Sequence, residues 1–206
     1  MIKTSGFNCC GGSYASQPQF SNNTLKYLSC FQGTLDKMIR DMSSVQLTDS
    51  ISHNFITQMI PHHQAAIEMS RNLLQYTTLI PLQDIALGII SEQTKSIENM
   101  KEILCKCSDS LNFSQDLKQY QVNFKEITGV MFSGMKNAAM SNSINVSFMN
   151  EMIPHHKGAV EMSQSALCFP ICSGLKPILN TIIVSQKKGI QQMETLLYDI
   201  NKCMQC

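Results

Sequence analysis

The segment MIPHHQAAIEM at residues 59–69 recurs, nearly unchanged, as MIPHHKGAVEM at residues 152–162, and this repeated segment decides the fold. Four of the five histidines in the chain lie in these two copies, as adjacent pairs. Methionines stand three to seven residues from the histidines, which places their side chains on one face of an α-helix. Each copy therefore predicts a helix that carries paired imidazoles between thioethers.

The repetition extends well beyond the histidine segment. A shift of 93 residues aligns residues 25–104 with residues 118–197 without a gap, and ten of the fourteen methionines then fall into five matched pairs. An ungapped repeat of this length indicates one structural unit made twice.

Each copy has the apolar periodicity of three helices. In the first copy these helices cover residues 27–45, residues 50–75 and residues 82–104, and no strand pattern competes with them. We expect turns around Pro81 and from Phe169 to Pro177, and a linker between the copies at residues 105–117. The fold class is therefore all-α.

The second helix of each copy is apolar on two strips, so it should contact two neighbours, as in a bundle. We predict that the second and third helices of both copies form one pseudo-two-fold four-helix bundle, with the first helices packed beside it. Two separate three-helix bundles are the alternative. Pro61 and Pro154 lie just before the histidines, where each should either kink its helix or begin a new one.

Composition excludes several classes of protein. The chain has 206 residues, 43% hydrophobic, and a formal net charge of +1 without basic clusters, which is unlike a nucleic-acid-binding protein. No apolar run is long enough to span a membrane, and the first twenty residues lack the apolar stretch of a signal peptide. We therefore expect a cytoplasmic protein or a processed mature form, with a flexible tail at residues 1–23, one domain at residues 24–202 and a cysteine-containing end at residues 203–206.

Imidazole and thioether together favour a soft transition-metal ion, because thioether is a poor ligand for Mg²⁺, Ca²⁺ or Mn²⁺. Cu(I) is the preferred ion, with Ag(I) and Zn²⁺ as alternatives. The predicted ligands are, in the two copies, Met59, His62, His63 and Met69, and Met152, His155, His156 and Met162. The methionines of the first helices, such as Met38 and Met131, fit a core role and a ligand role equally well.

The carboxylates argue against a di-iron enzyme. Glu68 and Glu161 are the only matched acids, and their helical position points them to the solvated edge. Neither histidine pair lies in a Glu-x-x-His motif, which di-iron carboxylate bundles use.

The nine cysteines form local pairs at residues 9–10, 105–107, 168–172 and 203–206, with Cys30 left over. None has a counterpart in the other copy, so they lie outside the shared chemistry. Reduced thiols, disulfides and peripheral metal ligands all remain open.

With the repeated His-His-x-x-Ala-x-Glu-Met core and the Ile-x3-Gln-x3-Ile-x2-Met pattern that follows it, the chain resembles the family named for domain of unknown function 305. The resemblance covers both repeats and implies a ferritin-like antiparallel helix bundle. It also implies copper binding by Met and His, as in the CopM-type members, and export, as in most members. The tryptophan common near the end of the third helix in that family is absent here.

The resulting hypothesis is a non-catalytic protein that binds copper or silver for metal buffering or resistance, with metal ions as its partners. A structural, coat-type helical protein without metal is the alternative, and a di-metal enzyme is a further one. A homo-oligomer is compatible with either.

Overall fold

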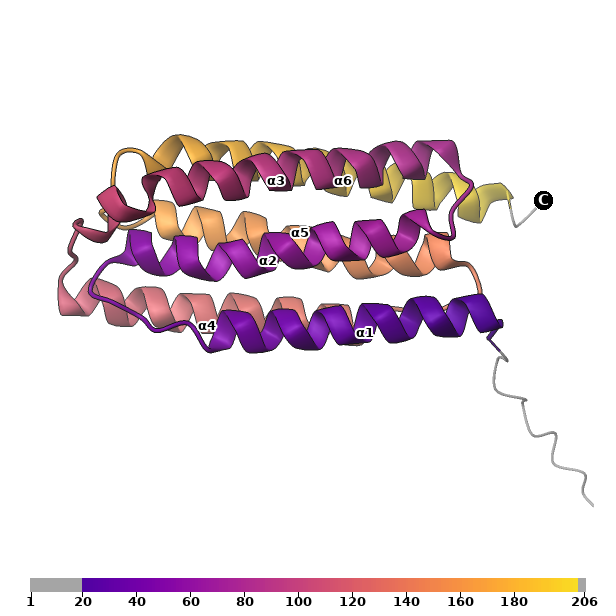
Figure 1. Cartoon of the computed structure of the whole chain (residues 1–206), viewed down its shortest axis with the longest axis horizontal. Coiled ribbons are helices and arrows are strands. Elements are labelled where there is room, and N and C mark those ends of the chain that lie inside the picture. Colours follow the sequence, from indigo (N-terminus) through magenta and orange to yellow (C-terminus); the bar gives the residue numbers. More distant parts are fainter. Residues whose placement is uncertain (1–19, 204–206) are drawn as a thin grey trace, which may run out of the picture.

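The computed structural model describes residues 20–203, which form six α-helices and no strand. The helices are α1 (Asn22–Ser43), α2 (Ile51–Leu74), α3 (Ile80–Ser108), α4 (Ser114–Lys136), α5 (Ile144–Leu167) and α6 (Leu175–Cys203). Each repeat supplies three consecutive helices, and all six run along the long axis of the molecule (Figure 1). The all-α prediction is confirmed.

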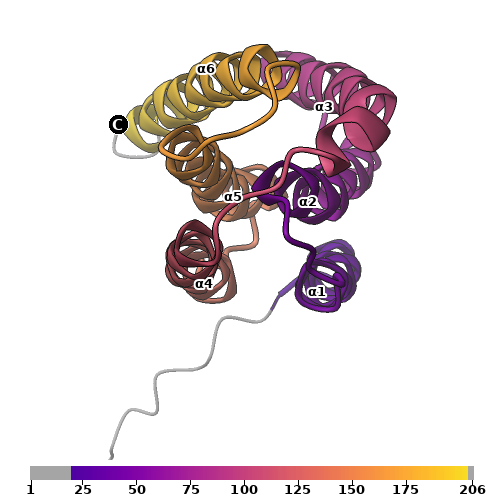
Figure 2. The same cartoon turned by 90° about the vertical axis from the view of Figure 1, so that its left-hand side faces the viewer.

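The helices lie in three layers of two, seen end-on in Figure 2. One layer holds α3 and α6, the middle layer α2 and α5, and the last layer α1 and α4. The two copies contact each other through α2 with α5 and through α3 with α6, while α1 packs on α2 and α4 packs on α5. Buried side chains from both copies form one hydrophobic core, so the copies do not fold as separate three-helix bundles.

The middle helices begin and face inward as the sequence predicts. Ser50 caps α2 by accepting a hydrogen bond from the backbone N–H of His53, and Ser143 caps α5 in the same way through Val146. One of the two strips of α2 is buried along its whole length, and it consists of Phe55, Met59, His62, Ala66, Met69 and Leu73. Burial of this stripe places the histidines in the middle layer of the molecule.

Of the two alternatives expected at Pro61 and Pro154, a kinked helix or a new helix, the structure excludes the new helix. Both α2 and α5 remain helical through Pro61 and Pro154, so no new helix begins at either residue. Pro81 and Pro177 lie in the first turns of α3 and α6 rather than in the preceding loops, because proline is tolerated where a helix has no intrahelical partner for the N–H.

The boundaries between the elements are also shifted. The connection between the copies spans residues 109–113 instead of 105–117, because α3 continues to Ser108 and α4 begins at Ser114. Helix α1 already begins at Asn22, inside the expected N-terminal tail. The remainder of that tail, up to residue 19, and residues 204–206 lie outside the described residues.

A disulfide joins Cys107, at the end of α3, to Cys172, in the loop between α5 and α6. It pairs one member of each of two local cysteine pairs and crosses between the repeats. Sequence spacing alone could not show this pairing. Cys30, Cys105, Cys168 and Cys203 are exposed and free.

None of the helices in residues 20–203 combines the length and the apolarity that crossing a membrane requires.

Candidate metal centre

The first histidines of the two pairs meet where α2 and α5 contact each other. The rings of His62 and His155 stack with their centroids 3.7 Å apart and their planes 25° from parallel. The Nε2 atom of His155 donates a hydrogen bond of 3.2 Å to the backbone carbonyl oxygen of His62. The pseudo-two-fold relation between the copies therefore brings together two imidazoles that are 93 residues apart in the chain.

The second histidines lie on either side of this stack. The ring centroid of His63 is 5.8 Å from that of His62, and the centroid of His156 is 5.9 Å from that of His155. His63 contacts α3, where its Nε2 atom is 3.1 Å from the Oγ atom of Ser96. His156 lies against α6, where a Cβ atom on Gly189 would be 2.9 Å from its Cδ2 atom and 3.0 Å from its Nε2 atom.

All four histidines are buried and have unpartnered ring nitrogens. The Nδ1 atoms of all four lack a hydrogen-bond partner, and so does the Nε2 atom of His62. Because Nε2 of His155 carries the donated proton, the lone pair of its neutral ring is on Nδ1. No neighbouring group donates a hydrogen bond to this lone pair. An unpaired buried polar atom costs about 1–3 kcal/mol, so this cluster destabilises the fold in the absence of a partner.

The histidines are neutral at pH 7. Burial lowers the pKa of His63 to about 3, reinforced by the neighbouring His155, and burial lowers the pKa of His155 to about 4. Burial, followed by the nearby imidazoles, holds the pKa values of His62 and His156 well below the usual 6.5. A neutral imidazole is the form that binds metal ions.

The predicted methionine ligands lie on the same two helices and are buried with the histidines. Met59, Met69, Met152 and Met162 are each at most 1% exposed. Met38, Met42, Met131 and Met135, on α1 and α4, are buried too, as are Met100 and Met193. Glu68 and Glu161 are exposed, as predicted, so their carboxylates lie outside the buried cluster.

Sequence reasoning missed a buried carboxyl group on α5, that of Glu151, four residues before His155. The Tyr27 hydroxyl donates a 2.6 Å hydrogen bond to Oε2 of Glu151, and burial raises the pKa of Glu151 to about 8 although this hydrogen bond opposes the shift. The pair related to it by the 93-residue repeat is Tyr120 with Gln58, at 3.4 Å, and both pairs join one copy to the other. The 93-residue alignment contained the signal, since it pairs a glutamine with a glutamate four residues before the first histidine.

Residues 20–203 contain no group of three or more His, Cys, Asp or Glu side chains arranged to hold a metal ion. The neutral nitrogens nevertheless fit a soft ion, because the buried Met59, Met69, Met152 and Met162 of α2 and α5 add thioether donors, which prefer soft ions. Metal binding here would require the methionine sulfurs in addition to imidazole.

Comparison with known proteins supports the fold. A family model described as a domain of unknown function (DUF305) matches residues 32–104 and residues 52–197. The crystal structure of a DUF305 fragment from Deinococcus radiodurans is similar, with a TM-score of 0.53 and 20% sequence identity over 72% of this chain and 96% of the fragment. The comparison with curated proteins gives no match. Because one family match covers more than half of the chain, this protein belongs to the DUF305 family.

Proposed function

We propose that this protein binds a soft transition-metal ion, Cu(I) in preference to Ag(I) or Zn²⁺, and serves in metal buffering or resistance without catalysis. The observation that carries the proposal is the cluster of four buried, neutral histidines, each of which has a ring nitrogen, Nδ1, that lacks a hydrogen-bond partner. A bound ion would accept the nitrogen lone pairs and remove the unfavourable desolvation of unpaired polar atoms.

The chemistry of the neighbouring donors supports a soft ion over a hard one. Met59 and Met152 precede the first histidines by three residues on the same buried stripes, and Met69 and Met162 follow them by seven. The matched carboxylates are exposed, and the Glu151 carboxyl is hydrogen-bonded to Tyr27. Nitrogen and thioether donors without a carboxylate favour copper or silver over Mg²⁺, Ca²⁺ or Mn²⁺.

A structural role for the histidines is the competing function. It is favoured by the stacked rings of His62 and His155 and by the hydrogen bonds of His155 and His63, which resemble the contacts of a polar core. The two functions predict different results when metal is added, since a purely structural cluster has no affinity for an ion.

The test is Cu(I) binding under anaerobic, reducing conditions to protein with alkylated cysteines. We expect stoichiometric binding that is lost when His62, His63, His155 and His156 are replaced by glutamine. A His53→Gln variant is the matched control, because the fifth histidine lies outside the cluster. Helix content by circular dichroism separates loss of a ligand from loss of folding.

Leucine substitution tests the thioethers separately. Replacing Met59, Met69, Met152 and Met162 by leucine keeps the hydrophobic volume while removing the sulfur atoms. Cu(I) affinity should fall in this folded variant.

Wild-type protein that binds no Cu(I) would establish the structural role instead. Unchanged binding by the histidine variant would place the metal elsewhere.

A further inference from the structure

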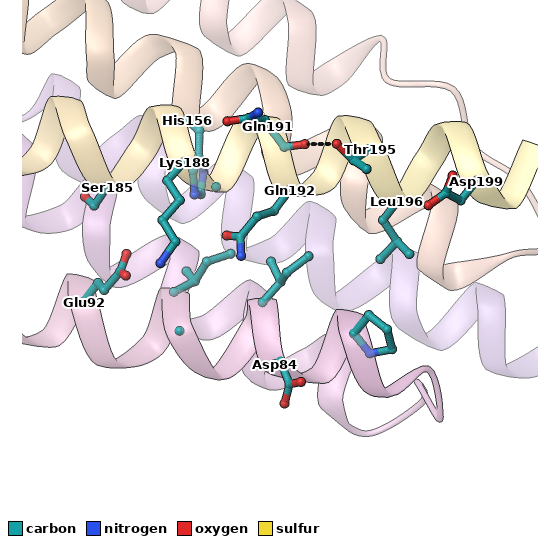
Figure 3. A pocket seen from close by; sticks show the side chains of 15 residues that line it. Asp84, Glu92, His156, Ser185, Lys188, Gln191, Gln192, Thr195, Leu196 and Asp199 are labelled. Carbon is teal, nitrogen blue, oxygen red and sulfur yellow. Dashed lines mark hydrogen bonds between the residues drawn. The ribbon is translucent and has the colours of Figure 1, made fainter.

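Two cavities open on the face formed by α3 and α6, and the second histidine of one pair lines each of them. The larger, of about 630 Å³, is shown in Figure 3, where α3 and α6 supply most of its lining and His156 enters from α5. The other cavity, of about 600 Å³, is lined by the equivalent histidine of the first copy, His63. The second histidine of each pair therefore separates the buried stack from a cavity at the surface.

The two histidines differ in what covers the ring nitrogen. Ser96 on α3 and Gly189 on α6 occupy equivalent positions in the 93-residue alignment. The Ser96 hydroxyl lies 3.1 Å from Nε2 of His63 and pairs with it. Gly189 has no side chain that could pair with the Nε2 atom of His156, which lies 3.0 Å from the position that a Cβ atom would occupy. His156 therefore presents a ring nitrogen with no competing partner at the position equivalent to Ser96, although its side chain is only 2% exposed.

The charges around the two cavities differ as well. The cavity at His156 is lined by three carboxylates, Asp84, Glu92 and Asp199, against one ammonium group, Lys188, a formal charge of −2. The cavity at His63 is lined by Glu92 and Lys95, which cancel. Negative charge around a concave site raises the local concentration of cations.

We propose that the two repeats are not equivalent, and that a soft cation reaches the buried cluster through the α3/α6 cavity by binding first to Nε2 of His156. Ser96 closes the matching route at His63. This inference rests on the proposed metal-binding function and adds the order in which the two copies load. The absence of a side chain at Gly189 is the device that keeps the route open.

The experiment is a titration with Ag(I) of the full-length protein whose cysteines have been alkylated. Long-range ¹H–¹⁵N NMR correlations of the imidazole rings are recorded at each step. Below one equivalent of Ag(I), the Nε2 resonance of His156 should shift, while that of His63 remains in place. The rate of Ag(I) binding, measured by stopped-flow mixing, should be several-fold lower in an Asp84→Asn/Asp199→Asn variant at low salt. This difference in rate should vanish at high salt.

Variants at Ser96 and Gly189, the two residues that lie against the ring nitrogens, provide matched comparisons. In Ser96→Gly, which only removes atoms, both Nε2 resonances should shift together. In Ser96→Gly/Gly189→Ser, His63 should shift first. Because a side chain at Gly189 crowds His156, the single Ser96→Gly variant keeps the test decisive if the double variant does not fold.

The results separate this inference from the function on which it rests. Equal early shifts of His63 and His156 in the wild type, with tight Ag(I) binding, would overturn the unequal loading and leave metal binding intact. Absence of Ag(I) binding by calorimetry, with no shift of any imidazole nitrogen, would overturn both.

Discussion

The buried Glu151 carboxyl should make the free energy of unfolding depend on pH in a way that a single substitution removes. Glu151 is 2% exposed and accepts a hydrogen bond from Tyr27, and burial raises its pKa to about 8 from the ordinary 4.5. The folded protein therefore retains a proton that the unfolded chain releases above pH 4.5. This contribution to stability is complete below pH 4.5 and is lost as the pH rises towards 8.

The size of the effect follows from the two pKa values. Each pH unit between 4.5 and 8 changes the free energy of unfolding by about 1.4 kcal/mol. From pH 4.5 to pH 7 the folded state should lose about 3 kcal/mol through this group alone. Glu151→Gln removes the titration while keeping an oxygen that accepts from Tyr27, as Gln58 does opposite Tyr120 in the other copy.

Urea unfolding at pH 5, 6, 7 and 8, followed by circular dichroism, measures this effect in metal-free protein. The stability of the Glu151→Gln variant relative to the wild type should rise with pH, by about 2.5 kcal/mol between pH 5 and pH 7. Gln58→Glu is the matched control and should introduce a similar loss in the first copy. A constant difference in stability between wild type and Glu151→Gln across pH 5–8 would refute the reasoning.

Three further outcomes follow from the same contacts. The pKa values of His63 and His155, lowered to about 3 and 4, should act in the opposite direction, because the unfolded chain takes up protons below pH 6.5. Metal-free protein should lose about 3 kcal/mol per pH unit through these two groups as the pH falls from 6.5 to 4. An acid titration with little change in stability down to pH 4 would contradict this. Replacement of Cys107 and Cys172 by alanine removes a covalent link between residues 65 positions apart and should lower the free energy of unfolding by about 4 kcal/mol. Replacement of the exposed Cys105 and Cys168 together is the control and should have little effect. In thermal unfolding, Gly158→Ala should destabilise the protein by about 1–3 kcal/mol, because its Cβ would overlap the Met131 side chain. Gly33→Ala, whose Cβ would have no atom within 4 Å, should stabilise the protein by about 0.5–1 kcal/mol.

Local sequence information determined which segments are helical and which of their faces are buried. The apolar periodicity depends on residues close together in the chain, the 93-residue repeat shows the same periodicity twice, and the helices of the structure agree with both. The helix start was less accurate around Pro81, because proline is compatible with both a loop and the first turn of a helix. The linker at residues 105–117 was predicted too long, since α3 continues to Ser108 and α4 begins at Ser114. Inward placement of His62 and of the methionines on α2 also followed from periodicity alone.

Tertiary structure decided the contacts between residues that are far apart in the chain. The stacking of His62 on His155, the Tyr27–Glu151 hydrogen bond and the Cys107–Cys172 disulfide join residues separated by 93, 124 and 65 positions. The difference between Ser96 and Gly189 appeared in the alignment as an ordinary substitution, and became informative only when each residue was found against a histidine ring. Periodicity specifies the face on which a side chain lies, whereas its partner depends on which helices pack together and in what register, and that is a property of the whole bundle.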